Sequence, residues 1–579
     1  MAATAAAHSH RQRRDSQSVN ATPAGNQMTS DSQDPQQQET SIPETLQSLI
    51  VAFALAMAVR SFVTEGFVIP TGSMAPTLMG QHARYTSDVT GYSYPYDAQP
   101  AFEGNMTFAL VDPMVSVDPV PGGIATIQSP AVRARTRMGD RVLVLKFLYS
   151  LREPDRWDVV VFKNPTDPIG DAANFIKRLV GLPNEQLLMI DGDIFTAPLG
   201  ADRSQFTVAR KPEHIQRAVW QKVYDSDYEP LDPSELSRRL GMPWAGPPFA
   251  ETGFDFGELD NRRVWTHDGD GTASLAWRWD RLPITDWVTY NVLRSRMPSG
   301  RPVPGAGKSP YAVSDIRFGA AIDARSPEAL VAEYTLTTRR RVMRFMLGEG
   351  KATLRIETQP EDAGEAAKVL GEASVPFTPP TAGKPLALEC WHVDQRLSLW
   401  INDVEIVRLD DVFESLEDRV LSSYFGRTVE DYARRPWFEQ PTPPQLSFTV
   451  RGSALDLHRV RVDRDIYYRP EQLEARQQAA ENGPAVEGPA FGLDFFNPAQ
   501  LKADQFMMCG DNSAFSKDSR LWGRPSPLVT EIHGETAPFI VPRPLLLGKA
   551  WCVYFPAPVP PTDGLPALMP DFGQLRFIR

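Results

Sequence analysis

The chain has 579 residues, and at about 150 residues per domain this length predicts several folded units, about four in all. With 42% hydrophobic and 23% charged residues, the composition is that of a globular protein and excludes a mainly disordered chain. The net charge of −12 argues against nucleic acid as a partner, because non-specific nucleic-acid binding depends on basic surfaces. The 52 prolines disfavour long helical arrays, and the scattered cysteines provide neither a disulfide framework nor a zinc or redox motif: Cys390, Cys509 and Cys552.

The N-terminal part of the chain changes character near residue 44. Residues 1–43 are rich in small and polar residues with almost no large apolar side chain, which predicts a disordered tail. The charge-free apolar run Thr45–Val59 follows, and it is shorter than the ~18 residues that a membrane span usually needs. If the Arg60 side chain reaches the interface, the helix can continue, so we predict a transmembrane helix over 44–66. A buried core helix is the alternative, and the run lies too far from the N-terminus for a typical cleaved signal peptide.

The next part of the chain has the pattern of an antiparallel β domain. Short Val- and Phe-rich segments, separated by turns that contain Pro and Gly, occur at Arg141–Phe147, Asp158–Phe162 and Phe175–Val180. Residues 81–138 show no clear pattern. We expect a first part of a β core over 67–195 and a second part over 501–579.

A long middle region separates these two parts. Its first portion, 196–312, is irregular and rich in proline, whereas 313–470 alternates short β-type segments with turns, as in a β-sandwich. Residues 471–500 have the composition of a linker. The predicted fold class is therefore mainly β: an N-terminal membrane helix, an antiparallel β core and an inserted β-sandwich lobe.

Two stretches of the middle region resemble known sandwiches. Ala387–Arg408 and Leu455–Tyr468 look like strands of a laminin-G or concanavalin-like jelly roll. Such lobes bind carbohydrate or protein, or act as rigid accessory lobes, so an unknown ligand of the insert stays open. Trp391 and Trp400 are interpreted as core aromatics rather than as a sugar platform, because large aromatics dominate sandwich cores.

Three blocks carry side chains suited to catalysis. In Ile69–Leu78, Ser73 lies between Gly72 and two prolines, in a turn that can present its hydroxyl, although a single serine of this kind is usually an ordinary turn residue. In Asn174–Glu185, Lys177 lies within an apolar β-type stretch where burial would lower the pKa of its amine; alone it would be an ordinary surface lysine. Met507–Gly523 forms the third block.

Together these blocks resemble the type I signal peptidases of bacteria, which are membrane-bound serine proteases with a Ser/Lys dyad. The matching stretches follow an N-terminal apolar segment in the order of the family: Ser73–Leu78, Gly139–Val144, Lys177–Pro183, Gly510–Asn512 and Ser516–Gly523. Counting the last two stretches as one motif, four ordered motifs make a specific signal, although they cover only a small part of the chain.

The resemblance implies roles for individual residues. Ser73 matches the nucleophile and Lys177 the general base, while the backbone N–H of Ser73 and the hydroxyl of Thr71 match the oxyanion hole. Three further residues match the supporting positions around the lysine: Ser516, which orients the amine, Asp518, and Arg520 as the ion-pair partner of Asp518.

The chemistry of the residues agrees with this reading. A serine hydroxyl needs an adjacent base, and none of the eight histidines lies in a matching block. A buried lysine can act as the base, because desolvation makes its charged form costly. Asp511 and Asn512 are interpreted as turn residues. Asn184 stands where the family commonly has glycine, and asparagine tolerates the left-handed backbone that such a turn needs.

The resemblance implies a single-pass protein of the cell membrane whose extracytoplasmic domain removes signal peptides from exported preproteins, without a metal or organic cofactor. Its expected partners are preproteins and the lipid bilayer. Two alternatives stay open: a non-catalytic surface protein that binds through the sandwich, and a peptidase of the same fold with a restricted client set. If the insert is only an accessory lobe, removal of residues 201–488 should leave an active core.

Overall fold

The structure, a computed structural model, describes residues 42–97, 112–115, 137–170, 173–230, 232–240, 244, 246–257, 263–291, 310–360, 366–473, 488–558 and 569–579. The chain divides into two units, Met1–Ala58 and Val59–Arg579. The predicted disordered tail lies outside the described residues except for its last two positions.

The apolar N-terminal segment forms helix α1 (Ile42–Ala58), which continues as one π-helical turn (Val59–Val63). The chain then becomes strand β1 (Thr64–Val68), so the helix predicted over 44–66 ends earlier than expected. The physical reason is the pairing of β1 with β4 (Arg141–Leu145), which provides hydrogen-bond partners that a longer helix would forgo. Among the helices of the described residues, none has both the length and the apolar character needed to cross a membrane.

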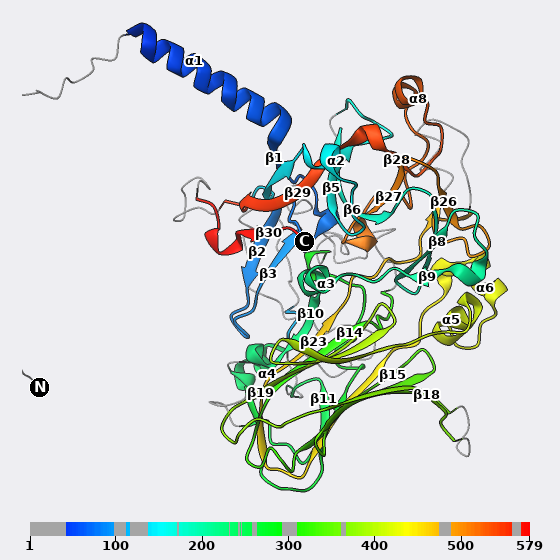
Figure 1. The fold of residues 1–579 in the computed structure, drawn as a ribbon. Helices are drawn as coiled ribbons and strands as arrows, with labels where there is room; N and C mark the ends of the chain where they lie inside the picture. Colours follow the sequence, from blue (N-terminus) through cyan, green and yellow to red (C-terminus); the bar gives the residue numbers. More distant parts are fainter. Residues whose placement is uncertain are drawn as a thin grey trace, which may run out of the picture. The chain divides into compact units, whose positions relative to one another are not determined.

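The two motif-bearing parts of the chain meet in one 8-stranded sheet with the order β1-β4-β29-β5-β6-β27-β28, in which β30 pairs with β29 (Figure 1). Its remaining strands are β5 (Val159–Lys163), β6 (Asn174–Gly181), β27 (Gln505–Cys509), β28 (Val541–Pro542), β29 (Leu546–Phe555) and β30 (Arg576–Phe577). Strand β29 lies between β4 and β5, and β27 pairs with β6. The first and last parts of the sequence are therefore interleaved.

Smaller sheets flank this one. A 4-stranded sheet has the order β26 (Ala499–Leu501), β7 (Glu185–Ile190), β8 (Asp193–Pro198) and β9 (Thr207–Val208). The sequence between 81 and 138, which showed no pattern, contains the hairpin β2 (His82–Thr86) and β3 (Ser93–Asp97). Strands β24 (Gln472–Leu473) and β25 (Gly488–Pro489) pair with each other within the predicted linker.

Two 7-stranded sheets form the insert and share one large hydrophobic core, as in a β-sandwich. The first sheet contains β10 (Gln221–Asp225), β12 (Val264–His267), β14 (Ile316–Ala324), β19 (Leu386–Val393), β20 (Arg396–Ile401), β21 (Val404–Asp410) and β23 (Leu455–Arg464). The second contains β11 (Phe249–Thr252), β13 (Ala273–Trp277), β15 (Val331–Thr338), β16 (Arg341–Gly348), β17 (Lys351–Thr358), β18 (Val369–Pro376) and β22 (Gln445–Arg451). The mainly β fold predicted from the sequence is confirmed.

The sandwich begins before the predicted boundary at residue 313. Strands β10 to β13 come from the region predicted to be irregular, and Trp265 and Trp277 of that region lie in the sandwich core. The prolines of this region hid the strands, because short strands between Pro-rich turns give little periodic signal. The helices of the part of the chain that the structure describes are short apart from α1: α2 (Leu148–Leu151), α3 (Glu213–Val219), α4 (Pro233–Leu240), α5 (Leu416–Ser423), α6 (Val429–Arg434) and α8 (Pro527–His533).

Trp391 and Trp400 are buried, as expected of core aromatics, but they lie outside the hydrophobic cluster between the two sheets. Their neighbours Cys390 and Leu399 occupy the core face, and strand alternation turns both tryptophans to the opposite face of the sheet. There the guanidinium of Arg217 lies 4.8 Å from the ring centre of Trp391 and 4.6 Å from that of Trp400.

The insert is joined to the rest of its unit by a continuous interior. Tyr468, at the end of the sandwich segment, packs in the same hydrophobic cluster as Leu187 and Met507. Beside it, Arg339 of the insert donates to Asp191 at 2.9 Å, and the arginine side chain is only 2% exposed. A buried ion pair leaves a costly isolated charge when one partner is removed, so this junction ties the two regions together.

Candidate active site

Ser73 lies in a short 3-10 helix, η2 (Gly72–Met74), that follows β1. The serine itself is 9% exposed. The carbonyl oxygen of Gly72 accepts a hydrogen bond from the backbone N–H of Ala75 at 3.0 Å and closes the turn. The carbonyl oxygen of Ser73 accepts from the backbone N–H of Asn512 at 3.1 Å. The predicted turn around the serine is thus present and is held from both sides.

Lys177 lies in the middle of β6, between β5 and β27, and its side chain reaches Ser73. Its Nζ atom lies 2.7 Å from the Oγ of Ser73 and donates a second hydrogen bond to the carbonyl oxygen of Ile176 at 2.9 Å. The lysine is 4% exposed, and its Nζ lies 5.2 Å from the centre of the Phe175 ring. The structure therefore brings together two residues that are 104 positions apart in the sequence.

Burial sets the protonation of this lysine. Desolvation lowers the pKa of the Lys177 amine from 10.5 to about 8, although the nearby negative charges of Asp518 and Asp511 act in the opposite direction. An amine with a pKa near 8 is neutral in a substantial fraction of molecules at mildly alkaline pH. Lys177 can then accept a proton from the hydroxyl of Ser73.

Asp518 and Arg520 form the ion pair predicted from the sequence. Arg520 donates to both carboxylate oxygens of Asp518, at 2.9 and 2.8 Å, and both side chains are fully buried. Asp518 also accepts from the backbone N–H of Gly510 at 2.9 Å. Burial alone would raise the pKa of the Asp518 carboxyl, but the charge of Arg520 and these hydrogen bonds outweigh it and hold the pKa below its usual value.

Ser516 and Thr71, two residues to which the resemblance assigns roles, differ in burial and in their position relative to Ser73. Ser516 is 3% exposed, and its Oγ makes no hydrogen bond to Lys177 among the described residues, so the predicted bond is not formed in this structure. A Cβ atom added to Gly510 would lie 2.2 Å from the Oγ of Ser516 and 2.5 Å from the carbonyl oxygen of Ser73, which places Ser516 beside the nucleophile turn. Thr71 is exposed, and its side chain does not cap the helix.

Asp511 and Asn512, interpreted as turn residues, have side chains that reach further than a turn requires. Both carboxylate oxygens of Asp511 accept from Arg178, at 2.8 and 2.7 Å, and one also accepts from the hydroxyl of Thr77 at 2.5 Å. The Nδ2 of Asn512 donates to the carbonyl oxygen of Gly72 at 2.9 Å. Both residues therefore support the segment that carries Ser73, and their position in the Gly-Asp-Asn motif was the signal for this role.

The insert contributes two residues that the sequence did not identify. Tyr290 and Asn291 form a 3-10 turn, η6 (Thr289–Asn291), and each is 1% exposed. Tyr290 packs against the glycine before the nucleophile, and Asn291 exchanges hydrogen bonds with Asn512. No motif marks these positions, because their contacts depend on how a region more than 200 residues away in the sequence folds back.

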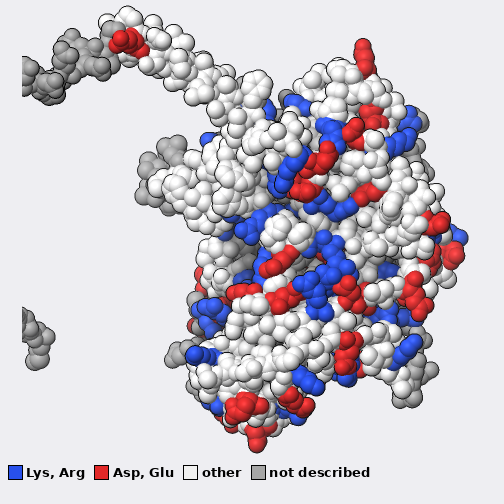
Figure 2. All heavy atoms as spheres, in the orientation of Figure 1, with Lys and Arg blue, Asp and Glu red and all other residues white. Residues whose placement is uncertain are grey.

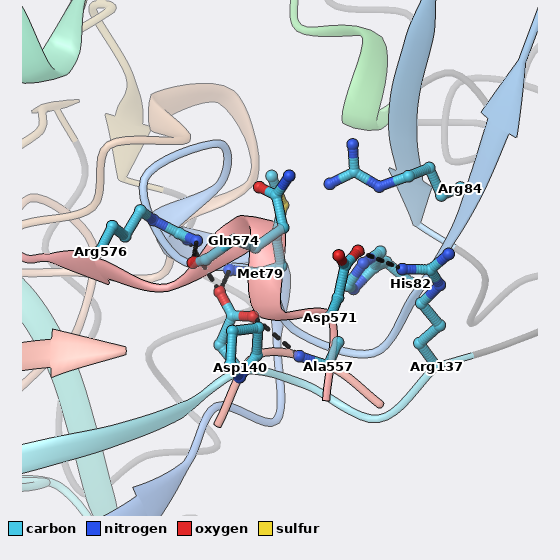
Figure 3. Close-up of a pocket in the computed structure, with 10 residues that line it drawn as sticks. Met79, His82, Arg84, Arg137, Asp140, Ala557, Asp571, Gln574 and Arg576 are labelled. Atoms are coloured by element: carbon cyan, nitrogen blue, oxygen red, sulfur yellow. Dashed lines mark hydrogen bonds and ion pairs between the residues drawn. The ribbon is translucent and has the colours of Figure 1, made fainter. Parts of the chain in front are cut away.

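Gly139 and Asp140, of a further matching stretch, fix the other end of the nucleophile segment (Figure 3). A side chain at Gly139 would collide with the carbonyl oxygen of Ile69, at 1.7 Å. The Asp140 carboxylate accepts from the backbone N–H of Met79 at 3.1 Å and from Arg576 at 2.9 Å. These contacts border a small, open hollow lined by Met79, His82, Arg84, Arg137, Asp140, Pro556, Ala557, Asp571, Gln574 and Arg576.

The described residues contain one group of carboxylates close enough to share a metal ion, with ligand atoms within 4.8 Å of one another: Asp193, Asp315 and Asp394. Each of them already faces a buried cation. The shortest of these contacts are Arg419 to Asp193 at 2.8 Å, Arg339 to Asp315 at 2.8 Å and Lys211 to Asp394 at 2.5 Å. The group is therefore an ion-pair network at the junction with the insert. None of the contacts named here involves Ser73 or Lys177.

Comparisons with known proteins agree with the motifs. Residues 120–217 match the family model described as signal peptidase, peptidase S26. The chain is 27% identical over 158 residues to signal peptidase I of Rickettsia rickettsii, which covers 27% of this chain and 44% of that protein. It is 25% identical over 185 residues to a probable signal peptidase I-2 of Synechocystis sp., covering 31% of this chain and 56% of the relative.

The chain thus spans about half the length of these curated relatives. The resemblance to type I signal peptidases predicted from the sequence is confirmed. Among solved structures, the carbohydrate-binding module CBM66 from Bacillus subtilis matches 38% of this chain and 97% of its own, at 10% identity and a TM-score of 0.20.

Proposed function

From the resemblance to type I signal peptidases and the contact between Ser73 and Lys177, we propose that the chain is a serine endopeptidase that removes signal peptides from preproteins. The single observation that carries the proposal is the buried Lys177 amine, 2.7 Å from the Ser73 hydroxyl. A serine next to a base of depressed pKa is the arrangement that nucleophilic catalysis needs. The direct test is cleavage of a preprotein in detergent by the wild type and by Ser73→Ala.

In the proposed reaction, neutral Lys177 accepts the proton of the Ser73 hydroxyl while Oγ attacks the scissile carbonyl carbon. The resulting oxyanion accepts hydrogen bonds from the backbone N–H of Ser73 and the hydroxyl of Thr71. When the C–N bond breaks, the protonated amine of Lys177 returns its proton to the leaving amine. Lys177 then takes a proton from the water that attacks the acyl carbon, and it returns this proton to the Oγ of Ser73 as the ester bond breaks, which restores the free serine and the neutral base.

The residues around the lysine support this cycle without entering it. Arg520 neutralises Asp518 in an interior where an unpaired carboxylate would be costly. The hydroxyl of Ser516 lies beside the nucleophile turn, and the resemblance assigns it the role of orienting the amine of Lys177.

The pH dependence follows from the lysine. Because the base works in its neutral form and its pKa is about 8, kcat/KM should rise about tenfold per pH unit below pH 8 and level off above it. The measurement is kcat/KM on a model preprotein peptide from about pH 5 to 10. A profile that is flat over pH 5 to 9 would contradict Lys177 as the base.

A substitution near the lysine sharpens this test. The negative charge of Asp518 raises the pKa of Lys177, so Asp518→Asn should move the midpoint of the profile to lower pH. Asp504, an exposed partner of Arg543, provides the matched control, and Asp504→Asn should leave the midpoint unchanged.

We further propose that α1 attaches the enzyme to a lipid bilayer. None of its residues is buried, and large apolar side chains along it are exposed, including Leu49 at 66% and Phe53 at 67%. Exposed apolar side chains also lie on β29 and β30, where Trp551 and Phe577 contact each other. Exposed apolar side chains of this kind mark protein or membrane contacts, and Figure 2 shows few charged side chains along α1.

Membrane association is tested by fractionation. The wild type should sediment with membranes and be released by detergent but not by high salt, because apolar contacts do not weaken with ionic strength. The double variant Leu49→Asp, Phe53→Asp should shift most of the protein to the supernatant, whereas Gln47→Asp on the same helix should not. Recovery of the wild type in the supernatant without detergent would contradict the proposal.

A further inference from the structure

The turn η6 of the insert lies directly against the nucleophile turn, although the two are more than 200 residues apart. We propose that Asn291, acting through Asn512, positions the backbone N–H of Ser73 as an oxyanion donor, so that the insert completes the active site. This inference rests on the proposed function. It assigns Asn291 as a positioning residue, since its side chain acts through another residue.

Tyr290 fixes where the turn can lie. A Cβ atom added to Gly72 would be 2.1 Å from Cε1 of the Tyr290 ring, so the tyrosine fills the space that any other residue at position 72 would occupy. Tyr290 also packs with Ala75 and Met79 in one small cluster, and its hydroxyl donates to the carbonyl oxygen of Gln81 at 3.3 Å. Tyr290 of the insert therefore contacts the segment that carries Ser73 at both ends, near Gly72 and at Gln81.

Asn291 and Asn512 form a reciprocal amide pair. The Nδ2 of Asn291 donates to Oδ1 of Asn512 at 2.7 Å, and the Nδ2 of Asn512 donates to Oδ1 of Asn291 at 2.9 Å. Both residues are 1% exposed, so water does not replace these bonds. The pair leaves one orientation for the Asn512 amide, and in that orientation its Nδ2 also donates to the carbonyl oxygen of Gly72 at 2.9 Å.

The bond to Gly72 determines where the next N–H points. The peptide group between Gly72 and Ser73 is planar and trans, so its C=O and N–H point in opposite directions. Holding the carbonyl of Gly72 toward Asn512 therefore aims the N–H of Ser73 away from Asn512. Catalysis depends on such a donor being fixed before the oxyanion forms, because a preorganised dipole does not have to reorient during the reaction.

Loss of Asn291 should therefore weaken catalysis more than binding. Without it the Asn512 amide can rotate, and the peptide before Ser73 keeps only the hydrogen bond from the backbone N–H of Ala75, so its orientation is held less firmly. Removing one oxyanion donor costs about 10²- to 10³-fold in kcat, and a loosened donor should cost less, about 10- to 100-fold. KM should change by less than about threefold, because the substrate ground state does not depend on the oxyanion contact.

The experiment is a double-mutant cycle on the full chain. Asn291→Ala, Asn512→Ala and the double variant are compared with the wild type for kcat, KM, pH profile and thermal melt. If Asn291 acts through Asn512, adding Asn291→Ala to Asn512→Ala should lower kcat by less than about twofold further. The midpoint near pH 8 should stay in Asn291→Ala, because Lys177 is untouched. Thr289→Ala, on the same turn, is the control and should retain wild-type kcat.

Three outcomes separate the possibilities. A wild-type kcat in folded Asn291→Ala, or independent and multiplicative losses in the double variant, would overturn the positioning role while leaving the peptidase intact. A wild type that does not cleave preproteins would instead overturn the proposed function, and the role with it. If Asn291→Ala does not melt cooperatively, Asn291→Ser is measured in its place, and wild-type kcat in that variant again overturns the role.

Discussion

A preprotein incubated with Ser73→Ala should remain uncleaved, and Lys177→Ala should lose activity by a similar factor, at least about 10³-fold in kcat. The reason is that neither group works alone: the hydroxyl needs the amine 2.7 Å away to take its proton. The variant lacking both side chains should be little worse than either single variant, because members of one catalytic unit are not additive. The measurement is the rate of preprotein cleavage in detergent.

The controls use residues of the same type on neighbouring elements. Lys163→Ala on β5 and Ser150→Ala on α2 should cleave at the wild-type rate, since neither contacts the dyad in the structure. Lys177→Arg should fail, because a guanidinium stays protonated at any workable pH and cannot act as the base. Cleavage by either single dyad variant at more than about a tenth of the wild-type rate would contradict the assignment.

Removal of residues 201–488, with the ends joined by a short Gly/Ser linker, should abolish cleavage as well. This reverses the expectation from sequence, which treated the insert as an accessory lobe. The insert supplies Tyr290 and Asn291 behind the nucleophile turn. It also covers apolar core residues such as Leu187 and Met507 through Tyr468. Without the insert, the apolar core residues become exposed to water, and the turn that carries Ser73 loses the contacts that hold it in place.

The assay compares the shortened and full-length proteins for cleavage rate and for a cooperative melt. We expect loss of at least about 10²-fold in rate, the cost typical of losing an oxyanion donor alone. Ser73→Ala in the full-length chain serves as the inactive but folded control. A shortened protein that melts cooperatively and cleaves at more than a tenth of the wild-type rate would restore the accessory-lobe interpretation.

The sequence predicted best what local chemistry determines. The burial of Lys177 followed from its apolar neighbours on one strand, and the structure agrees. Asn184 has a φ of 62°, the left-handed backbone expected of an asparagine at that turn. The family role of Ser516 beside Lys177 implied that the first and last blocks meet in space, and in the structure β27 pairs with β6.

What the sequence missed depends on contacts between distant segments. The end of α1 was misplaced because the pairing of β1 with β4 is invisible in a single apolar run. Strand β10 was missed because it is short and follows a helix directly. Asn291 had no signal at all: an isolated asparagine in an irregular region becomes significant only when folding brings it to Asn512.

The interleaved strand order has a consequence for biosynthesis. Strand β29 is the shared neighbour of β4 and β5, and it is separated from β5 by almost 400 residues. A growing chain therefore holds Ser73 and Lys177 long before the sheet that supports them can close. The sheet that supports these two residues can therefore close only after residues 546–555 leave the ribosome, at the end of synthesis.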